Sequence, residues 1–426
     1  MVTRRLFLGS AGAGAAVLAD LCKPPAWAQA AGGGLAEKAR LKPLKRRVLG
    51  YPINMNTPSD DFFAWRHELF DVGVNAFAFN NVGNPFRPSP IPYNTHDLER
   101  ETIISFARTF AFQADDAWGF VSHSGTDSNM HGMYLGKTLL KGRTGKTPKA
   151  YFTREAHYSV QILRDLLGLE AVDVATLTDG SMDAGDLARK LVVNGNDPAL
   201  VVATVGTTFK GAVDDVDAIR QALTGRQSYL HVDAALFGGY LPFTSSAATV
   251  QHRGGSAAGG RYDSIAVSCH KFFGFPTPAG LFVTTRRLYD EFNAYFSKIH
   301  NPEYIHQVPG TITCSRDSVK PAEFHYFTRP SVQKRLAADA AKMLENTAFF
   351  VDEMRRRFTR LNATRSNPLS NTVYFRHPGD DIVRKYSLAT MQVELGGRRE
   401  KYAHVIVMPH VTRDVIAEFL ADLGSS

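Results

Sequence analysis

Cysteine is scarce in this sequence of 426 residues, which contains three. Cys22 lies within the first thirty residues, so Cys269 and Cys314 are the two in the rest of the chain. A scaffold held together by many disulfides is therefore excluded, although these two cysteines could still pair in an oxidising compartment. No group of cysteines and histidines has the spacing of zinc ligands, and we expect no metal site.

Long apolar runs, and basic runs interleaved with aromatic residues, are also missing. Beyond the first thirty residues no segment approaches the length of a membrane span, so we expect no span in the mature protein. The net charge of +8 is a mild excess, and the arginine run at 355–357 has the pattern of a solvated helix face. We therefore expect no nucleic-acid partner.

The first thirty residues have a basic start, an apolar middle rich in glycine and alanine, and a small-residue end at "AWAQA". This is the plan of a secretory signal peptide, and it is too short to anchor in a membrane. Arg4 and Arg5, followed by Leu-Phe-Leu, resemble a twin-arginine export signal; an ordinary Sec signal or a disordered start is the alternative. The resemblance implies the twin-arginine machinery as a partner and export in the folded state, to the periplasm or beyond the cell.

Three regions are expected after this signal peptide of residues 1–30. An N-terminal segment (31–96) is polar and proline-rich, and "NNVGNPFRPSP" (80–90) within it has the pattern of a loop. A large domain (97–320) alternates helical and strand-like patterns, which predicts an α/β domain around a mostly parallel sheet. A smaller α+β domain (321–426) is predicted from a long helical pattern, two strand-like runs and a last amphipathic helix. The strands of the large domain are expected at 118–122, 149–153, 171–176, 199–205, 228–234, 263–268 and 279–285.

Polar residues follow several of these strands at the point where each strand ends. In parallel α/β sheets, ligands bind at the carboxyl ends of the strands. Ser124, Gly125 and Thr126 follow the strand at 118–122 and open a helix. Such a turn suits a phosphate group, but it is also common as an ordinary helix cap. His157 follows the next strand, where a lone histidine is more often a cap or a surface residue.

Two charged residues in this set are harder to explain as surface side chains. Asp233 follows an apolar strand, where a carboxylate is costly unless it is paired. Lys271 follows "SIAVSCH"; taken alone, it fits a lysine whose ammonium reaches water from a strand end. Thr207 comes after a glycine at the end of a neighbouring strand. An acid, a lysine, an imidazole and a phosphate-binding turn at one sheet edge are the set that pyridoxal 5′-phosphate needs.

Five segments occur in the order and context found in one enzyme family. They read "AHYSV", "VGTTFKGAVDDVDAI", "LHVDAALFGGYLPF", "DSIAVSCHK" and "TITCSRDS". On these segments, the chain from about residue 50 to 423 resembles the group II pyridoxal-phosphate-dependent amino acid decarboxylases, most closely those that act on histidine in bacteria and on serine in plants. The resemblance implies a type I fold for pyridoxal-phosphate enzymes, with a mostly parallel seven-stranded sheet. It also implies pyridoxal 5′-phosphate as cofactor, an amino acid substrate and a homodimer with sites at the subunit interface.

The resemblance further implies roles for individual residues. Lys271 corresponds to the lysine that binds the cofactor covalently, His157 to the imidazole stacked on its ring, and Asp233 to the acid that pairs with its ring nitrogen. Ala235 corresponds to the small residue beneath the ring, and Tyr304 to a mobile-loop tyrosine that donates a proton near the substrate α-carbon. The other expected cofactor contacts are Ser124, Gly125, Thr126, Thr207, Ser268 and His270, and the expected substrate contacts are Asn80, Asn81, Ser315 and Arg316.

The sequence departs from the family pattern in three places. "SGTDSN" replaces a glycine-rich "GGTEGN", which places serines at 124 and 128 and predicts a tighter loop, and "SCHK" replaces "SGHK". "SRDSV" replaces "SRNGH" at 315–319, near the expected site of the partner subunit, and leaves the substrate open between histidine and other polar amino acids.

Two other functions are compatible with the sequence. The first is an oxygen-dependent decarboxylative oxidase that forms an aldehyde, or another tailoring enzyme on the same fold; the retained Tyr304 argues against the oxidase. The second is a catalytically inactive binding protein, which the retained Lys271, Asp233 and His157 oppose.

Overall fold

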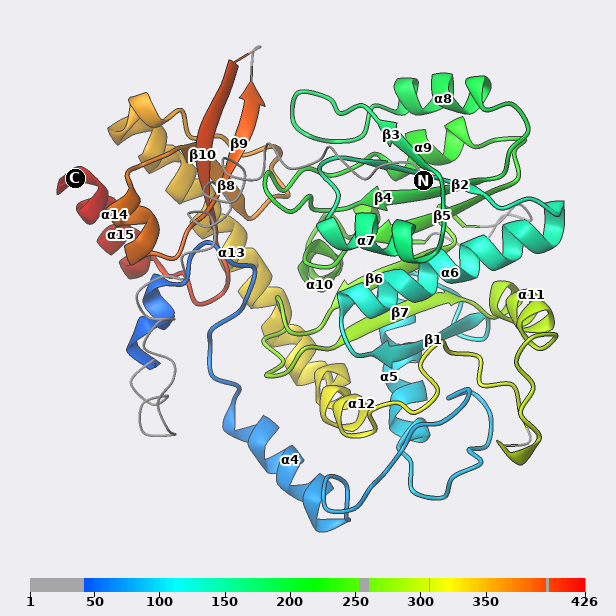
Figure 1. Ribbon diagram of the computed structural model, residues 1–426. Helices are drawn as coiled ribbons and strands as arrows, with labels where there is room; N and C mark the ends of the chain where they lie inside the picture. The colour runs from blue at the N-terminus through cyan, green and yellow to red at the C-terminus, as the bar shows by residue number, and fades with distance from the viewer. Residues whose placement is uncertain (1–41, 253–259, 306, 396–397, 426) are drawn as a thin grey trace, which may run out of the picture.

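The computed structural model describes residues 42–252, 260–305, 307–395 and 398–425, and Figure 1 labels its elements. The predicted signal peptide lies outside the described residues. None of the helices in the described part of the chain is both long and apolar enough to cross a membrane. Within the same residues, no three histidine, cysteine or acidic side chains come together as metal ligands would.

A seven-stranded sheet with the order β1-β7-β6-β5-β4-β2-β3 forms the centre of the larger part of the molecule. Strand β7 runs antiparallel to β1 and β6, and the other pairs are parallel. The predicted α/β fold of type I pyridoxal-phosphate enzymes, with a mostly parallel seven-stranded sheet, is confirmed. The strands are β1 (Ala117–Ser122), β2 (Lys149–Thr153), β3 (Ala171–Val174), β4 (Ala199–Thr204), β5 (Ser228–Asp233), β6 (Ser264–Ser268) and β7 (Gly280–Thr285).

Hydrophobic cores lie on both faces of this sheet, which explains why its strands are apolar at nearly every position. In β4, Leu200 and Val202 point into one core, and Val201 and Ala203 into the other. One face is covered by α6 (Gly125–Thr144), α7 (Tyr158–Leu166) and α11 (Arg286–Phe296). The other face is covered by α5 (His96–Thr109), α8 (Ala184–Val193), α9 (Val216–Ala222) and α10 (Phe237–Tyr240).

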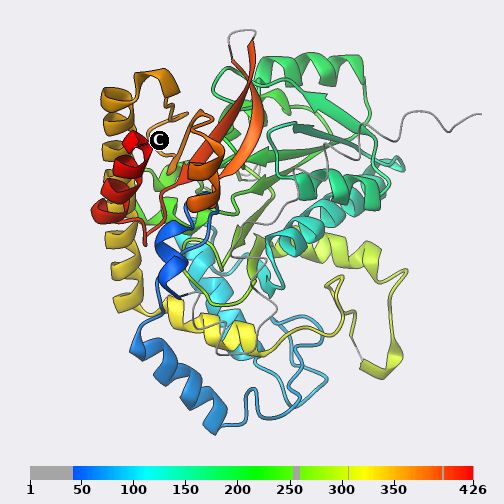
Figure 2. The ribbon, with the colours of Figure 1, turned by 60° about the vertical axis from the view of Figure 1, so that its left-hand side comes forward.

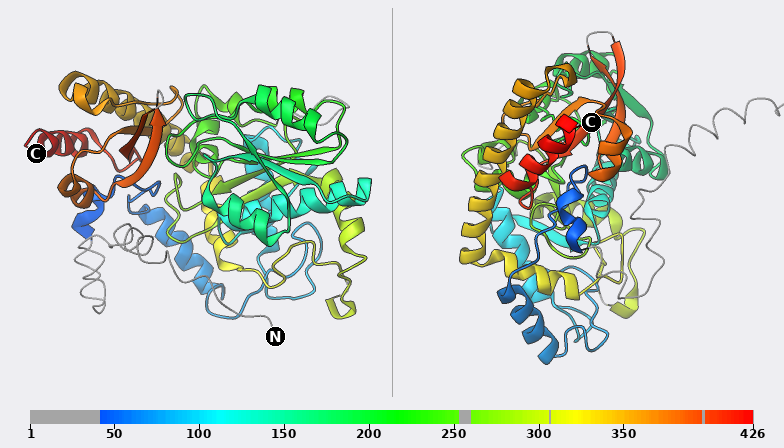
Figure 3. Two further views of the ribbon diagram at one scale, coloured as in Figure 1. Left: turned by 45° about the horizontal axis from the view of Figure 1, so that its top comes forward. Right: turned by 90° about the vertical axis from the view of Figure 1, so that its left-hand side faces the viewer.

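A smaller antiparallel sheet with the order β8-β10-β9 forms the core of the C-terminal part. The long helix α13 (Pro330–Arg357) contacts both parts, since it packs on α10 as well as on β8 and α15. Figures 2 and 3 show α13 lying along one side of the molecule, with α15 beside it. The other elements here are β8 (Thr372–Arg376), α14 (Asp380–Lys385), β9 (Ala389–Leu395), β10 (Arg398–Ile406) and α15 (Arg413–Ser425).

The loop predicted at residues 80–90 of the N-terminal segment is confirmed, whereas the helices that precede it were not predicted. Residues 80–90 have no regular structure, but α4 (Asp60–Asp71) and a 3-10 helix (Lys42–Arg47) precede them. Helix α4 buries Phe62 and Leu69, and it packs on α12 (Val319–Phe324), a partner far away in the sequence. Helix α12 crosses the boundary expected at 320/321, so the division into domains stays a prediction.

Candidate active site

The carboxyl ends of β1, β5 and β6 meet at one edge of the large sheet. Ser122 at the end of β1 and Ser268 at the end of β6 both lie opposite Gly280 of β7. Helix α6 begins against the same edge, because a Cβ added to Gly125 would lie 2.3 Å from the Ser268 Oγ and 3.8 Å from the Ala235 Cβ. Only a glycine lets the helix start approach the strand ends this closely.

Lys271 follows β6 by three residues and is only partly exposed. Burial lowers the pKa of its amine, and Asp233 opposes that shift. Burial also lowers the pKa of His157, with Asp233 raising it and Lys271 lowering it further. These mutual effects place the lysine, the acid and the imidazole near one another at this edge. The lowered pKa increases the share of neutral, nucleophilic amine at neutral pH.

Asp233 ends β5 with its side chain 3% exposed, and both of its oxygens accept hydrogen bonds. Oδ2 accepts from Asn129 Nδ2 at 2.8 Å, and Oδ1 accepts from the backbone N–H of Ala235 at 3.1 Å. Two donors stabilise a buried carboxylate in its ionised form. The carboxylate is therefore held in place and suited to pair with a positively charged group.

His157 is the N-cap residue of α7, so the alternative reading of this histidine as a helix cap is also correct. Its Nδ1 accepts a hydrogen bond from the backbone N–H of Ser159 at 3.2 Å and lies 2.8 Å from the Ser159 Oγ. Because Nδ1 is an acceptor, Nε2 carries the proton of the neutral ring. The cap fixes the plane of the imidazole beside Lys271 and Asp233.

The first turn of α6 has the properties of an anion-binding site. The Ser124 Oγ caps the helix by accepting from the Asp127 N–H at 3.2 Å. The N–H groups of Gly125 and Thr126 precede the first intrahelical bonds, and the helix dipole is positive at this end. These two donors suit a phosphate group.

The two serines that replace family glycines here are accommodated without strain. Ser124 has φ −170°, an extended conformation that any residue adopts. The Ser128 Oγ is buried 2.6 Å from the Ser122 Oγ. The expectation of a tighter loop stays a prediction.

The remaining expected cofactor contacts lie at neighbouring strand ends. The Thr207 Oγ1 accepts from the Ala212 N–H at 2.9 Å, which leaves its proton available to another acceptor. His270 Nδ1 donates to the Ala279 carbonyl at 3.2 Å, so Nε2 is its unbound ring nitrogen. Cys269, which precedes His270, is buried, and this burial raises the pKa of its thiol, whereas Cys314 is exposed; both cysteines are free.

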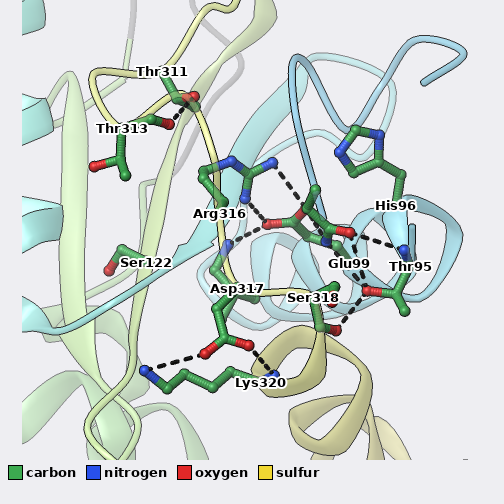
Figure 4. A network of polar contacts seen from close by, with 12 residues as sticks. Thr95, His96, Glu99, Ser122, Thr311, Thr313, Arg316, Asp317, Ser318 and Lys320 are labelled. Carbon is green, nitrogen blue, oxygen red and sulfur yellow. Dashed lines mark hydrogen bonds and ion pairs between the residues drawn. The ribbon is translucent and has the colours of Figure 1, made fainter. Parts of the chain in front are cut away.

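The four expected substrate contacts belong to one polar network around Glu99, of which Figure 4 labels Arg316, Glu99 and Thr95. The Asn80 Oδ1 accepts from the Arg316 N–H, and its amide donates to the Ser315 Oγ. Asn81 is fully buried and donates to the Glu99 Oε2 at 3.0 Å. The network joins the segment 80–84 to the segment 315–318, far apart in the sequence.

Arg316 forms a buried ion pair with Glu99. Its guanidinium bonds both carboxylate oxygens, with Nη2 to Oε2 at 3.0 Å, and it lies over the Phe120 ring. The side chains are 2% and 0% exposed. Since the guanidinium is held by Glu99, a contact of Arg316 with substrate stays a prediction.

Asp317, which replaces an asparagine of the family pattern, lies two residues before α12. Its Oδ1 accepts from the backbone N–H groups of Val319 and Lys320 at 2.9 and 3.0 Å.

Tyr304 does not join the other expected catalytic residues within one chain. It lies in a 3-10 helix (Glu303–Ile305) and is 83% exposed. It lines two cavities of about 660 and 600 Å³, the first with residues of 84–90 and α11, and the second with residues of 299–314. None of the expected cofactor contacts lines either cavity.

Two residues of the site, Asn129 and His231, were not predicted from the sequence. The signal that could have identified His231 is the alternation in "SYLHVD", which places Tyr229, His231 and Asp233 on one face of β5. Three polar side chains on one face of a buried strand require hydrogen-bond partners. Asn129 supplies one of them from α6.

These residues fit pyridoxal 5′-phosphate. Lys271 is a partly buried amine suited to an aldehyde, Asp233 a hydrogen-bonded carboxylate suited to a pyridine nitrogen, and His157 a fixed imidazole suited to stacking on a ring. The free N–H groups at the start of α6 suit the phosphate.

The chain matches a known family model and several known proteins. Residues 122–376 match the pyridoxal-dependent decarboxylase conserved domain. The chain is 31% identical to a histidine decarboxylase of Solanum lycopersicum, covering 89% of this chain and 84% of the relative. It is 32% identical to serine decarboxylase 1 of Oryza sativa subsp. japonica, covering 88% of this chain and 71% of the relative.

A solved structure has the same fold. L-methionine decarboxylase from Streptomyces sp. 590 superposes with a TM-score of 0.77 over 92% of this chain and 95% of that one, at 23% sequence identity.

Proposed function

Because this chain belongs to the pyridoxal-dependent decarboxylase family and decarboxylates an amino acid with pyridoxal 5′-phosphate, we propose that its substrate is histidine or another polar L-amino acid. The observation that carries this proposal is its similarity, over most of its length, to proteins named histidine and serine decarboxylases. The departure at 315–319, on the expected substrate side, is why the proposal names a class of amino acid. The products are the corresponding amine and carbon dioxide.

Each residue at the sheet edge would bind a different part of the cofactor. Lys271 would attach it covalently, and Asp233 would hold its ring nitrogen protonated. His157 would support the ring plane, and the N–H groups of Gly125 and Thr126 would bind the phosphate. When bound, pyridoxal 5′-phosphate supplies an electron sink for the electron pair left by the departing carboxylate.

The functional unit that we propose is a homodimer. Tyr304 is the expected donor of a proton to the substrate α-carbon, yet in one chain it lies exposed and apart from Lys271. Helix α7 also exposes Tyr158, Ile162 and Leu166, which are spaced by four residues and form one apolar stripe. A second copy that covers such surfaces would place the Tyr304 loop of one chain at the site of the other.

We further propose that the protein is exported in the folded state by the twin-arginine route. The support is the sequence of the first thirty residues alone, with Arg4-Arg5 before its apolar segment. Changing both arginines to lysine should retain the protein in the cytoplasm in a cell fractionation experiment. Unchanged export of that variant would contradict the proposal.

One assay tests the substrate proposal and separates it from the alternatives. The purified holoprotein is incubated with a panel of L-amino acids while the cofactor absorbance, carbon dioxide, amine and peroxide are measured. We expect equal amounts of amine and carbon dioxide from a polar amino acid, and neither product from Lys271→Ala. Stoichiometric peroxide would instead identify an oxidase, and a protein without cofactor absorbance would be a binding protein.

A further inference from the structure

A chain of buried polar side chains lies behind the carboxylate of Asp233. It runs from Tyr229 through Ser264, His231 and Asn129 to Asp233, and each of these residues is at most 3% exposed. The Tyr229 hydroxyl lies 2.8 Å from the Ser264 Oγ, and that oxygen lies 2.8 Å from His231 Nδ1. His231 Nε2 lies 3.0 Å from the Asn129 Oδ1, and Asn129 Nδ2 lies 2.8 Å from the Asp233 Oδ2.

In this row of side chains, every hydrogen bond is donated in the direction of Asp233. The amide of Asn129 must direct its nitrogen at the carboxylate, since the opposite orientation would place two oxygens together. Its oxygen therefore accepts from His231, which fixes the proton of the neutral imidazole on Nε2. Nδ1 is then an acceptor for Ser264, whose oxygen accepts in turn from Tyr229. Burial lowers the pKa of His231 to about 4, which agrees with a neutral ring.

Two glycines of helix α6 leave room for this row of hydrogen-bonded side chains. A Cβ at Gly132 would lie 2.4 Å from His231 Nδ1, and a Cβ at Gly136 would lie 2.6 Å from the Tyr229 ring. Asn129, Gly132 and Gly136 are spaced so that they share one face of the helix. The helix thus lies close enough to β5 for the Asn129 amide to reach Asp233.

We propose that Asn129 and His231 are positioning residues that hold the Asp233 carboxylate ionised and directed at the ring nitrogen of the cofactor. A hydrogen bond to an ionised group is stronger than one between neutral groups, and aligned donors in a buried chain polarise one another. Without His231, the Asn129 oxygen loses its donor, and the amide is held only at the end that faces Asp233. The proposal rests on the cofactor of the family and is independent of the substrate identity.

The test compares three variants of the holoprotein. His231→Phe removes the donor to Asn129, whereas His231→Gln keeps an N–H near the position of Nε2. His131→Phe is the matched control, because His131 is a buried histidine of α6 whose ring nitrogens have no partner among the described residues. Each protein is loaded with pyridoxal 5′-phosphate labelled with ¹⁵N in the ring, and the ¹⁵N chemical shift reports whether that nitrogen is protonated.

We expect a protonated ring nitrogen in the wild type, His231→Gln and His131→Phe, and loss of that proton in His231→Phe. The kcat of His231→Phe should also fall about tenfold with little change in KM, since the buried Asn129 oxygen is left without its hydrogen-bond donor. A wild-type ring-nitrogen shift in folded His231→Phe would overturn the proposal.

A measurement on the unchanged holoprotein keeps the proposal testable if His231→Phe does not fold. The ¹⁵N spectrum of labelled histidines, assigned with His231→Gln, should show His231 neutral with its proton on Nε2. A charged ring, or a proton on Nδ1, would overturn the proposal. These readouts need no substrate, so their failure is distinguishable from failure of the amino acid panel.

Discussion

Buried histidines in this protein differ in whether their ring nitrogens have partners. His231 has a partner on each nitrogen, and His404 lies between the carbonyl groups of Phe209 and Gly50. His131 is 1% exposed and has no partner on either nitrogen among the described residues, although it stacks on Trp118. Its contribution to stability therefore depends on its remaining neutral.

This difference predicts how stability responds to acid. Burial lowers the pKa of His131 from 6.5 to about 3, so below pH 6.5 the unfolded chain binds a proton that the folded protein does not. The free energy of unfolding should fall as the pH is lowered from 6.5, and His131→Phe should reduce this loss by about 1.4 kcal/mol per pH unit. Urea unfolding of wild type and His131→Phe at pH 6.5 and pH 5 measures this change in the free energy of unfolding. A variant of an exposed histidine, His67→Gln, is the control. Parallel pH profiles of wild type and His131→Phe would contradict the prediction.

At the scale of elements, the Glu99–Arg316 pair ties three segments together. Glu99 on α5 also accepts from the Val121 N–H of β1 at 2.9 Å and from the Asn81 side chain. Arg316 begins the stretch that enters α12, where Asp317 caps the helix. The carboxylate thus fixes the base of the loop that carries Tyr304 against the large sheet.

Removing the charge of Arg316 should therefore lower the stability of the folded protein. Arg316→Met leaves a buried carboxylate without its cation, and the free energy of unfolding should fall by about 3–5 kcal/mol. Lys342→Met removes the cation of the exposed pair with Glu345, whose side chains are 61% and 57% exposed, and should cost less than about 1 kcal/mol. Denaturant unfolding of both variants measures the difference. Equal losses in the two variants would show that burial does not matter here.

At the scale of the whole molecule, the position of Tyr304 bears on whether one chain can form a complete active site. The cofactor residues lie at the carboxyl edge of the large sheet, while Tyr304 lies on an exposed loop between two cavities. A homodimer resolves this separation if each chain supplies its tyrosine to the other.

A subunit mixing experiment tests that arrangement. Lys271→Ala and Tyr304→Phe dimers should each be inactive or impaired, whereas a mixed dimer has one site with both residues intact. Random mixing should restore roughly a quarter of wild-type activity, because half of the dimers are mixed and one of their two sites is complete. Activity no greater than the sum of the parents would show that Tyr304 does not act across the interface.

The sequence alone predicted most of the elements and the candidate residues of the cofactor site. The period of two in the strands, the helical spacing between them and the polar residues at strand ends are local patterns, and they located Lys271, Asp233, His157 and the turn at Ser124. Helix α4 was missed because its burial depends on α12, which no local pattern shows.

Only the tertiary structure decided what surrounds these residues. The hydrogen-bonded chain behind Asp233 requires α6 to cross β5 at a glycine face, and the Glu99–Arg316 pair joins positions 217 residues apart. Such contacts depend on strand order and helix packing, which bring distant segments together to satisfy buried polar groups. For the same reason, the place of Tyr304 apart from Lys271 could be seen only in the folded chain.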